Sequence, residues 1–398
     1  MFTLRKRLVL AFVSLLLITT NACFPASEPT TPVARSGDGA LYKIDDMSVA
    51  VLKGNWYEMG FQYGTLLKKD MISHLQTISA GMLLMIGKES YGNFCDLAET
   101  QLKLYPKRFR EIHRGMSDGS GLSMREISIL EHYIAADIAF GSGLFCSSLA
   151  VWDDFTSDGK LVMGRNFDFP SIYKQGAPYL GVTVFNPTDG STPTATLGYV
   201  GHIGAVNVFN ADGVVAEVNV ALNLDAENSR LHLNRITAPI SLVSLGFDCS
   251  GIDQLDAALN TYRFNTALLC TVADEKEART YEVGTRDVIC RDVDEPGMNT
   301  VTNWASDPRW ENVSENTSEA RRGNLQVLAR KNKGKIDVKL MKSLFELTIS
   351  EGGATNSGTI HQFVFMPESC ALSIRRPDYK KGKWTDVDLK HFFESVSE

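Results

Sequence analysis

The chain has 398 residues, 44% apolar and 22% charged, which is enough for one large or two smaller globular domains. Its formal net charge is −7, with both signs mixed along the chain, and this excludes the basic surface that a nucleic-acid-binding protein needs. We therefore expect a globular protein with no nucleic-acid partner.

The first residues have the pattern of a bacterial export signal. Three basic residues precede an apolar run over 8–18, which is too short to span a bilayer comfortably. The residues before Cys23 resemble a lipoprotein processing site, although Thr20 stands where Leu is usual. The sequence predicts a signal peptide over 1–22 and a lipid anchor on Cys23 at a membrane surface, with periplasmic or secreted protein as the alternative. A flexible tether is predicted over 23–41, where Pro, Ser and Thr are frequent.

Residues 42–145 are predicted to form a helical prosegment that begins with a short strand. A first helix is expected to run to about Met85, and a second covers 97–116 with an interruption at a proline. A third helix begins at a capping box at Ser123 and leads the chain to Cys146.

Two features of the first helix stand out. Gly60 and Gly64 each cost roughly 1 kcal/mol relative to Ala inside a helix, so they predict close packing against another element. The run GMLLMIG over 81–87 is apolar and contains methionine. It fits either a helix core or the wall of an acyl-chain groove beside the nucleophile.

A β-hairpin is predicted over 143–170. Cys146 opens a half-buried strand, residues 157–159 supply the turn, and the return strand leads to Arg165 and Asp168. Because the ribbon folds back on itself, the thiol, the guanidinium and the carboxylate come out at the same edge.

This trio suits a nucleophilic cysteine. A free thiol has a pKa of about 8.5 and attacks as the thiolate, which a fixed Arg165 would stabilise. No histidine lies within about ten residues of the hairpin in sequence, so a base is missing. Cleavage of the Phe145–Cys146 bond would free an α-amino group with a pKa of roughly 7.7 to 8.0, which could take the thiol proton while Asp168 holds it. The alternative for Cys146 is a small buried hydrophobic residue.

Downstream of the hairpin, strands and helices come in alternating blocks. Their order is compatible with an α+β fold in which two layered sheets lie between helix pairs. Strands are predicted over 179–185, 195–199, 205–209, 214–220, 267–273, 279–283, 301–303, 359–366 and 371–374, and helices after Ser250 and over 319–330 and 337–347.

No motif for a cofactor or a metal is found. The stretch GYVGHIG over 198–204 lacks the GxGxxG spacing and the helix that follows it, and no P-loop, GxSxG or HExxH occurs. The cysteines other than Cys23 and Cys146 show no CxxC spacing. The sequence therefore predicts neither a cofactor nor a metal, and it selects no disulfide.

CSSLAVWDD followed by DGKLVMGRNFDFP resembles the nucleophile hairpin of the cysteine N-terminal-nucleophile (Ntn) hydrolases. These include choloylglycine hydrolases, acid ceramidase, N-acylethanolamine acid amidase and the isopenicillin N acyltransferase family, which GNWYEMGFQYG and AVNVFNADG also resemble. The resemblance implies a four-layer αββα Ntn-hydrolase sandwich. It also implies self-cleavage into a prosegment chain over 42–145 and a catalytic chain over 146–398, which stay associated.

The resemblance carries over further site residues. In the family, the strand at the end of GHIGAVNVFNADGVVAEVNV places an Asn toward the nucleophile, and here this is Asn219. Asn223 is an alternative on the same face, and backbone capping is an alternative role for Asn219. NTVTNW resembles the family's TNH stretch and adds Asn303, although Trp304 follows it here.

SEAR looks like the family's SxxR and implies that Arg321 belongs to the site, with a solvated helix arginine, or Arg322 in its place, as alternatives. The activity implied is hydrolysis of linear amide bonds in small N-acyl substrates through an acyl-cysteine. Acyl transfer to an amine and a non-catalytic, lipid-anchored binding protein remain alternatives. An apolar acyl group is expected, because a lipid-anchored enzyme meets acylated amines at a membrane surface.

Overall fold

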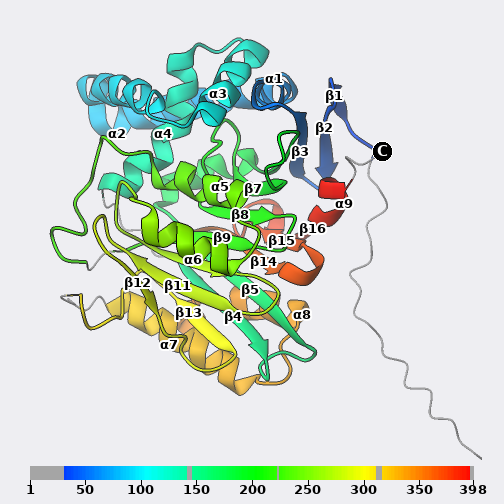
Figure 1. Ribbon diagram of the computed structural model, residues 1–398, viewed down its shortest axis with the longest axis vertical. Coiled ribbons are helices and arrows are strands. Elements are labelled where there is room, and N and C mark those ends of the chain that lie inside the picture. The colour runs from blue at the N-terminus through cyan, green and yellow to red at the C-terminus, as the bar shows by residue number, and fades with distance from the viewer. Residues whose placement is uncertain (1–30, 141–145, 222–223, 311–315, 395–398) are drawn as a thin grey trace, which may run out of the picture.

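The computed structural model describes residues 31–140, 146–221, 224–310 and 316–394 (Figure 1). The predicted signal peptide, Cys23, Phe145 and Asn223 lie outside these residues, so the statements about them stay predictions. Within the described ranges, no helix combines the length and the apolar character needed to cross a bilayer.

The N-terminal part, residues 31–140, contains strands as well as helices. The predicted end of the tether at residue 41 is wrong, because strands form from residue 34 and the buried Leu41 pairs with Ala50. The prosegment is therefore not purely helical. Its elements are β1 (Ala34–Ser36), β2 (Gly39–Ile44), β3 (Met47–Gly54), α1 (Trp56–Leu66), α2 (Lys68–Leu102), α3 (Lys107–Ser120) and α4 (Met124–Phe140).

Helices α1 and α3 cross with their backbones in contact. A Cβ atom added to Gly60 would lie 2.0 Å from the carbonyl oxygen of Ile112, and one added to Gly115 would lie 2.2 Å from that of Tyr57. Gly64 faces Met116 in the same way. The close packing predicted for Gly60 and Gly64 is confirmed.

We expect Gly60→Ala to destabilise the protein by about 1–3 kcal/mol, because the added methyl group must push α1 away from α3. Gly81→Ala on α2 is the matched control, since a Cβ there meets nothing within 4 Å. The stability of this control variant should be unchanged or should rise by up to about 1 kcal/mol, because Ala has a higher helix propensity than Gly. Urea unfolding measures both, and equal midpoints for the two variants would contradict the packing argument.

Two sheets make up the rest of the molecule. The larger has ten strands in the order β1-β2-β3-β6-β7-β8-β9-β10-β11-β12, and the smaller has six in the order β13-β4-β5-β14-β15-β16. Strand β3 pairs in parallel with β6, so the N-terminal part extends the larger sheet. The strands are β4 (Ser147–Asp153), β5 (Gly159–Asp168), β6 (Leu180–Pro187), β7 (Thr194–Tyr199), β8 (Asn207–Asn210), β9 (Val215–Val220), β10 (Leu268–Ala273), β11 (Ala278–Val283), β12 (Val288–Arg291), β13 (Met298–Val301), β14 (Thr359–Met366), β15 (Ala371–Arg375) and β16 (Trp384–Asp388).

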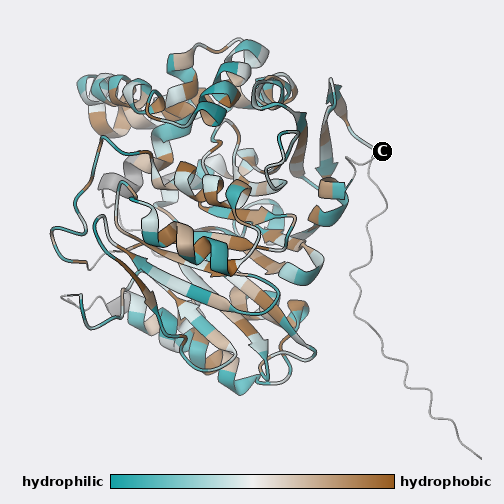
Figure 2. Cartoon of the chain, viewed as in Figure 1, coloured by the Kyte–Doolittle hydropathy of each residue, from teal (hydrophilic) through white to brown (hydrophobic). Residues whose placement is uncertain are grey.

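The sheets pack face to face, and helices cover their outer faces (Figure 1). Phe209 on β8 meets Phe365 on β14 between the sheets, with ring centroids 4.8 Å apart, and Figure 2 shows hydrophobic residues concentrated on these central strands. The predicted α+β class and four-layer αββα arrangement are confirmed. The covering helices are α5 (Ala238–Asp248) and α6 (Ile252–Thr261) on the larger sheet, and α7 (Asn316–Lys331) and α8 (Val338–Glu346) on the smaller; α9 (Leu389–Glu394) ends the described chain.

Two helices differ from the prediction. Helix α5 was not predicted, because its residues from Ala238 to Phe247 are all buried and it lacks the polar face that produces helical periodicity. Helix α2 continues to Leu102, well beyond the predicted end at Met85, with one non-helical residue at Gly87 (φ 76°).

Candidate active site

The predicted hairpin is present as β4 and β5. Ser148 pairs with Arg165 in the antiparallel ladder, so Cys146, just before β4, returns to Asp168 at the end of β5. The Cys146 thiol donates to the backbone carbonyl of Asp168, with Sγ and O 3.8 Å apart. Strand pairing thus places the Cys146 thiol beside Asp168.

The Asp168 carboxylate lies in a polar cradle. Its Oδ1 accepts a hydrogen bond from the Thr359 hydroxyl at 2.6 Å, and its Oδ2 accepts one from the Asn356 amide at 2.6 Å. The guanidinium of Arg321 lies 4.0 Å from Oδ2. Burial raises the pKa of Asp168 to about 6, against the opposing effects of Arg321, Thr359 and Asn356, so the group is ionised at neutral pH. Asn356 and Thr359 were not predicted, because they follow Asp168 by almost 200 residues.

Arg165 lies fully buried between the sheets and is ion-paired with Glu217 on β9. It also donates to the backbone carbonyls of Val206 and Val218, at 3.1 and 2.6 Å. Burial raises the pKa of the Cys146 thiol, and the opposing effect of Arg165 does not overcome it. In the uncut chain, the thiol is therefore not activated by Arg165 as the sequence suggested.

Glu217 is a residue that the sequence prediction missed. It is fully buried, and its second oxygen accepts a hydrogen bond from the Ser148 hydroxyl at 2.7 Å. A charged residue in the middle of the apolar strand VVAEVNV was the signal available in the sequence, since a buried carboxylate needs a partner. Glu217 thus supplies the buried ion-pair partner of Arg165.

Arg321 on α7 also contacts Cys146. Its Nη1 donates to the Cys146 carbonyl oxygen at 2.7 Å, and its Nη2 donates to Oδ1 of Asn303 at 3.3 Å. Asn303 in turn donates to a backbone carbonyl at the end of β9, at 2.9 Å. Arg321 is buried and not solvated, whereas Arg322 pairs with Asp294. Arg321 is thus the one of the two that contacts Cys146.

Asn219 lies with Cys146 on a small apolar cavity of about 20 Å³. Its Nδ2 donates to the backbone carbonyl of Thr302 at 3.3 Å, while its buried Oδ1 has no hydrogen-bond partner among the described residues. The side chain therefore bonds the backbone and also borders the nucleophile's cavity. The other lining residues are Phe167, Phe169, Val206, Val218, Val220, Ala238 and Leu268.

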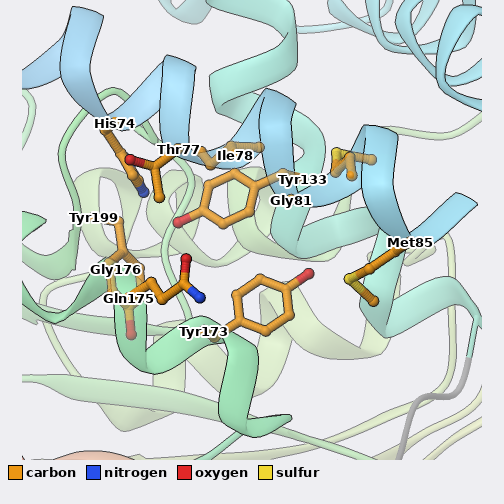
Figure 3. A pocket seen from close by; sticks show the side chains of 11 residues that line it. His74, Thr77, Ile78, Gly81, Met85, Tyr133, Tyr173, Gln175, Gly176 and Tyr199 are labelled. Carbon is orange, nitrogen blue, oxygen red and sulfur yellow. The ribbon is translucent and has the colours of Figure 1, made fainter. Parts of the chain in front are cut away.

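A second hollow of about 50 Å³ lies between α2, α4 and the 3₁₀ segment η1 (Ser171–Tyr179), and Figure 3 shows Tyr133 and Tyr173 beside it. The Tyr173 ring meets Phe169 edge to face, with centroids 4.8 Å apart. Phe169 also lines the Cys146 cavity, so the contact between Phe169 and Tyr173 joins the walls of the two hollows. The second hollow is lined by His74, Thr77, Ile78, Gly81, Met82, Met85, Tyr133, Tyr173, Gln175, Gly176 and Tyr199.

This aromatic pocket carries no formal charge. Burial lowers the pKa of His74 to about 4, so its ring is neutral at pH 7 while Nδ1 bonds the Val200 carbonyl at 2.7 Å. The neighbouring run on α2 is exposed, with Leu84 at 85% and Met85 at 55% exposure. The helix-core interpretation of GMLLMIG is therefore wrong for these residues, and Met85 points toward the pocket in Figure 3.

The N-terminal part, residues 31–140, contacts the rest of the chain through a buried carboxylate. Glu131 on α4 accepts hydrogen bonds from the backbone N–H groups of Ile203 and Gly204, at 2.9 and 3.0 Å, and bonds His113 at 2.9 Å. Burial raises the pKa of Glu131, but His202 and His113 more than offset this and bring it to about 2. The GYVGHIG stretch thus binds a carboxylate of the same chain.

Neither a cluster of metal ligands nor a disulfide is found among the described residues. They contain no group of three or more His, Cys, Asp or Glu side chains that could hold a metal ion. Their six cysteines are all free, so none of these forms a disulfide with another.

No protein-family model matches the chain. An uncharacterised protein of Archaeoglobus fulgidus is 29% identical in an alignment of 158 residues, and the match covers 32% of this chain and 25% of that protein. Protein dcd1B of Dictyostelium discoideum is 24% identical over 284 residues, 65% of this chain and 55% of that protein. The chain thus spans about a quarter of the length of the first relative and about half of the length of the second.

Several solved structures are distantly similar. An N-acylethanolamine-hydrolyzing acid amidase ortholog from Caenorhabditis elegans matches with a TM-score of 0.43 and 14% identity over 56% of this chain and 93% of its own. Conjugated bile acid hydrolase from Clostridium perfringens matches with a TM-score of 0.41 and 12% identity, over 62% of this chain and 94% of its own. Penicillin V acylase from Agrobacterium tumefaciens matches with a TM-score of 0.43 and 11% identity, over 61% of this chain and 86% of its own. These similarities are too low to assign the chain to a family.

Proposed function

We propose that the chain is a self-processing cysteine amidohydrolase of the Ntn type, which cleaves linear amide bonds of N-acyl substrates through an acyl-cysteine. The observation that carries the proposal is the position of Cys146, with its thiol against Asp168 and its carbonyl held by Arg321. A cysteine kept only for packing needs neither a buried carboxylate in a polar cradle nor a buried guanidinium.

The missing base supports self-processing. The uncut chain has a raised thiol pKa at Cys146, and a new α-amino group there would provide a proton acceptor that is internal to the residue. Asp168, ionised and bonded by Asn356 and Thr359, would hold the resulting ammonium. Arg321 would keep the residue in place after the cut, because it bonds the carbonyl on the catalytic side of the cleaved bond.

In the first half-reaction, the α-amino group of Cys146 takes the thiol proton, and sulfur attacks the amide carbonyl of the substrate. Asn219 stabilises the oxyanion through Nδ2, which then exchanges its bond to Thr302 for one to the substrate. As the tetrahedral intermediate collapses, the C–N bond breaks and the leaving amine takes the ammonium proton. The acyl group remains on sulfur as a thioester.

In the second half-reaction, water attacks the thioester after giving a proton to the α-amino group. The C–S bond breaks, the acid leaves, and the thiolate recovers the proton. An amine that attacks in place of water would make the enzyme an acyltransferase, and product analysis with added amine acceptors separates the two. A non-catalytic binding protein would leave purified Cys146 unreactive toward a thiol probe near neutral pH.

We propose an apolar acyl group as the substrate class, bound in the aromatic pocket. The pocket is neutral, and Tyr173 in its wall contacts Phe169, which lines the Cys146 cavity. Exposed apolar residues at its mouth, such as Leu84, suit substrates that arrive from a membrane surface. Export and lipid anchoring at Cys23 belong to the same proposal.

A panel of N-acyl amides graded by acyl length tests this substrate class on processed enzyme. We expect kcat/KM to rise with each added methylene while the pocket fills, by about fourfold for each fully buried CH₂. Gly81→Leu, which adds bulk to the pocket wall without a clash at Cβ, should shorten the preferred chain. A flat response to length, or activity confined to short polar acyl groups, would overturn the assignment.

Asn219→Ala should slow turnover by roughly 10²- to 10³-fold, because it removes an oxyanion donor. Labelling of Cys146 by a thiol probe should stay intact. Asn210→Ala is the matched control, since Asn210 is a buried amide of the same sheet that bonds the carbonyls of Gly246 and Cys249. It should lower stability and leave kcat unchanged. Full turnover in Asn219→Ala would exclude the oxyanion role.

A further inference from the structure

A hollow of about 460 Å³ opens at the edge of the molecule, where the β2–β3 turn meets the connection between β15 and β16. Its size lies in the range of small-molecule sites. None of its lining residues lines the Cys146 cavity or the aromatic pocket. Nothing in the proposed reaction uses it.

The lining is rich in positive charge. Four cationic side chains, Arg376, Lys380, Lys381 and Lys383, line the hollow, and all four come from eight consecutive residues. The facing turn contributes two carboxylates. The four cations and two carboxylates together give the wall a formal charge of +2, in a protein whose net charge is −7.

The carboxylates are already engaged. Asp46 is ion-paired with Arg376 at 2.6 Å and with Lys380 at 3.8 Å, and Asp45 accepts a hydrogen bond from the Thr385 hydroxyl at 3.2 Å. In the part of the chain that the structure describes, Lys381 and Lys383 form no ion pair. These two ammonium groups are therefore available to a ligand.

The backbone around the hollow is strained. Five non-glycine residues of the described chain have positive φ, and three of them, Asp45 (52°), Lys380 (44°) and Lys381 (68°), line this hollow. Such conformations each cost on the order of 1–3 kcal/mol and cluster at sites that hold ligands. Gly382, which lies between Lys381 and Lys383, also has a positive φ (57°).

The hollow is connected to the wall of the aromatic pocket. Arg376 donates to the carbonyl of Ala177 in η1 at 2.8 Å, and Lys174 of η1 is ion-paired with Asp378. Residues 376–378 thus fix the segment that carries Tyr173 and Gln175. A ligand that orders the loop would also order this wall.

We propose that this hollow binds a phosphate-type anion, either a soluble phosphate ester or the phosphate of a lipid headgroup, through Lys381 and Lys383. A phosphate monoester carries close to two negative charges at pH 7, which matches the +2 of the wall, and the phosphodiester of a lipid headgroup carries one; both offer acceptor oxygens to ammonium donors. The proposal does not rest on amidase activity, because binding alone tests it.

Calorimetric titration of the purified protein with inorganic phosphate at low ionic strength measures the site directly. We expect saturable binding with a Kd of about 1 mM or tighter. The double variant Lys381→Gln/Lys383→Gln should weaken it at least about tenfold, since both charge-assisted contacts are lost. Lys276→Gln is the control, because Lys276 is an exposed lysine on the β10–β11 turn with no place in the hollow.

Flotation with vesicles distinguishes the source of the phosphate. If a headgroup is the ligand, phosphatidylglycerol vesicles should retain the wild type more than phosphatidylcholine vesicles do, and the lysine double variant should lose this preference. Any lipid on Cys23 is shared by both proteins and cancels in the comparison. Binding of free phosphate without a vesicle preference assigns a soluble ester. Binding that survives unchanged in the double variant, or no saturable binding in either assay, overturns the site.

Discussion

Cys146→Ala is expected to remain a single chain on a denaturing gel, whereas the parent protein separates into a prosegment ending at Phe145 and a larger fragment that begins at Cys146. The substitution removes the sulfur that attacks the preceding carbonyl, and no other thiol lies in this cavity. Amide turnover should fall to background in the same variant. This is the largest effect that we predict.

Cys290→Ala is the control for this experiment. Cys290 is the exposed thiol among the described cysteines, so its removal leaves processing intact and clears the background for labelling Cys146. N-terminal sequencing of the larger fragment should read Cys-Ser-Ser. Cleavage that persists in Cys146→Ala would rule out autocatalysis by this thiol, and an uncut, inactive parent protein would favour the binding-protein alternative.

Asp168→Asn is expected to slow both self-cleavage and turnover by about 10²- to 10⁴-fold, the usual range for a group that controls proton transfer. The amide keeps the size of the side chain but removes the charge that would hold the Cys146 ammonium. It also places an N–H₂ group against Asn356 or Thr359, which now donate to the carboxylate. Asp158→Asn, in the exposed hairpin turn, is the matched control and should process normally.

The pH dependence of Asp168 has a definite sign. Its folded pKa of about 6 lies above the value of an unfolded Asp, so the folded chain binds more protons between pH 4 and pH 6. Its contribution to stability is therefore present below about pH 4 and is lost as the pH rises through about 6. In uncut Cys146→Ala protein, the urea midpoint should fall over this interval, and Asp168→Asn should remove that part of the fall.

Activity should show the opposite trend, because the ionised carboxylate is the working form. We expect kcat/KM to decline on the acid side at or below about pH 6, since the new ammonium at Cys146 lowers the pKa of Asp168 further in the cut enzyme. If kcat/KM already declined on the acid side at a pH well above 7, another group would control the rate.

The hairpin with Cys146 and Asp168 was predictable because it depends on local alternation and one turn. Asn356 and Thr359 were not, since their contact with Asp168 exists only after β14 pairs with β5. Glu217 was missed because it meets Arg165 across two sheets. Local patterns thus predicted the residues that share one hairpin, the family resemblance added Asn219, Asn303 and Arg321, and neither pointed to Asn356, Thr359 or Glu217.

The parallel pairing of β3 with β6 has a consequence for the order of the folding reaction. Before cleavage, this ladder joins two parts of one chain, so refolding is unimolecular and its rate is independent of protein concentration. If the chain is cut before Cys146 as proposed, the same ladder joins two separate polypeptides. Denatured mature protein must then recover its sheet through a second-order encounter, and its yield should fall on dilution while that of uncut Cys146→Ala does not.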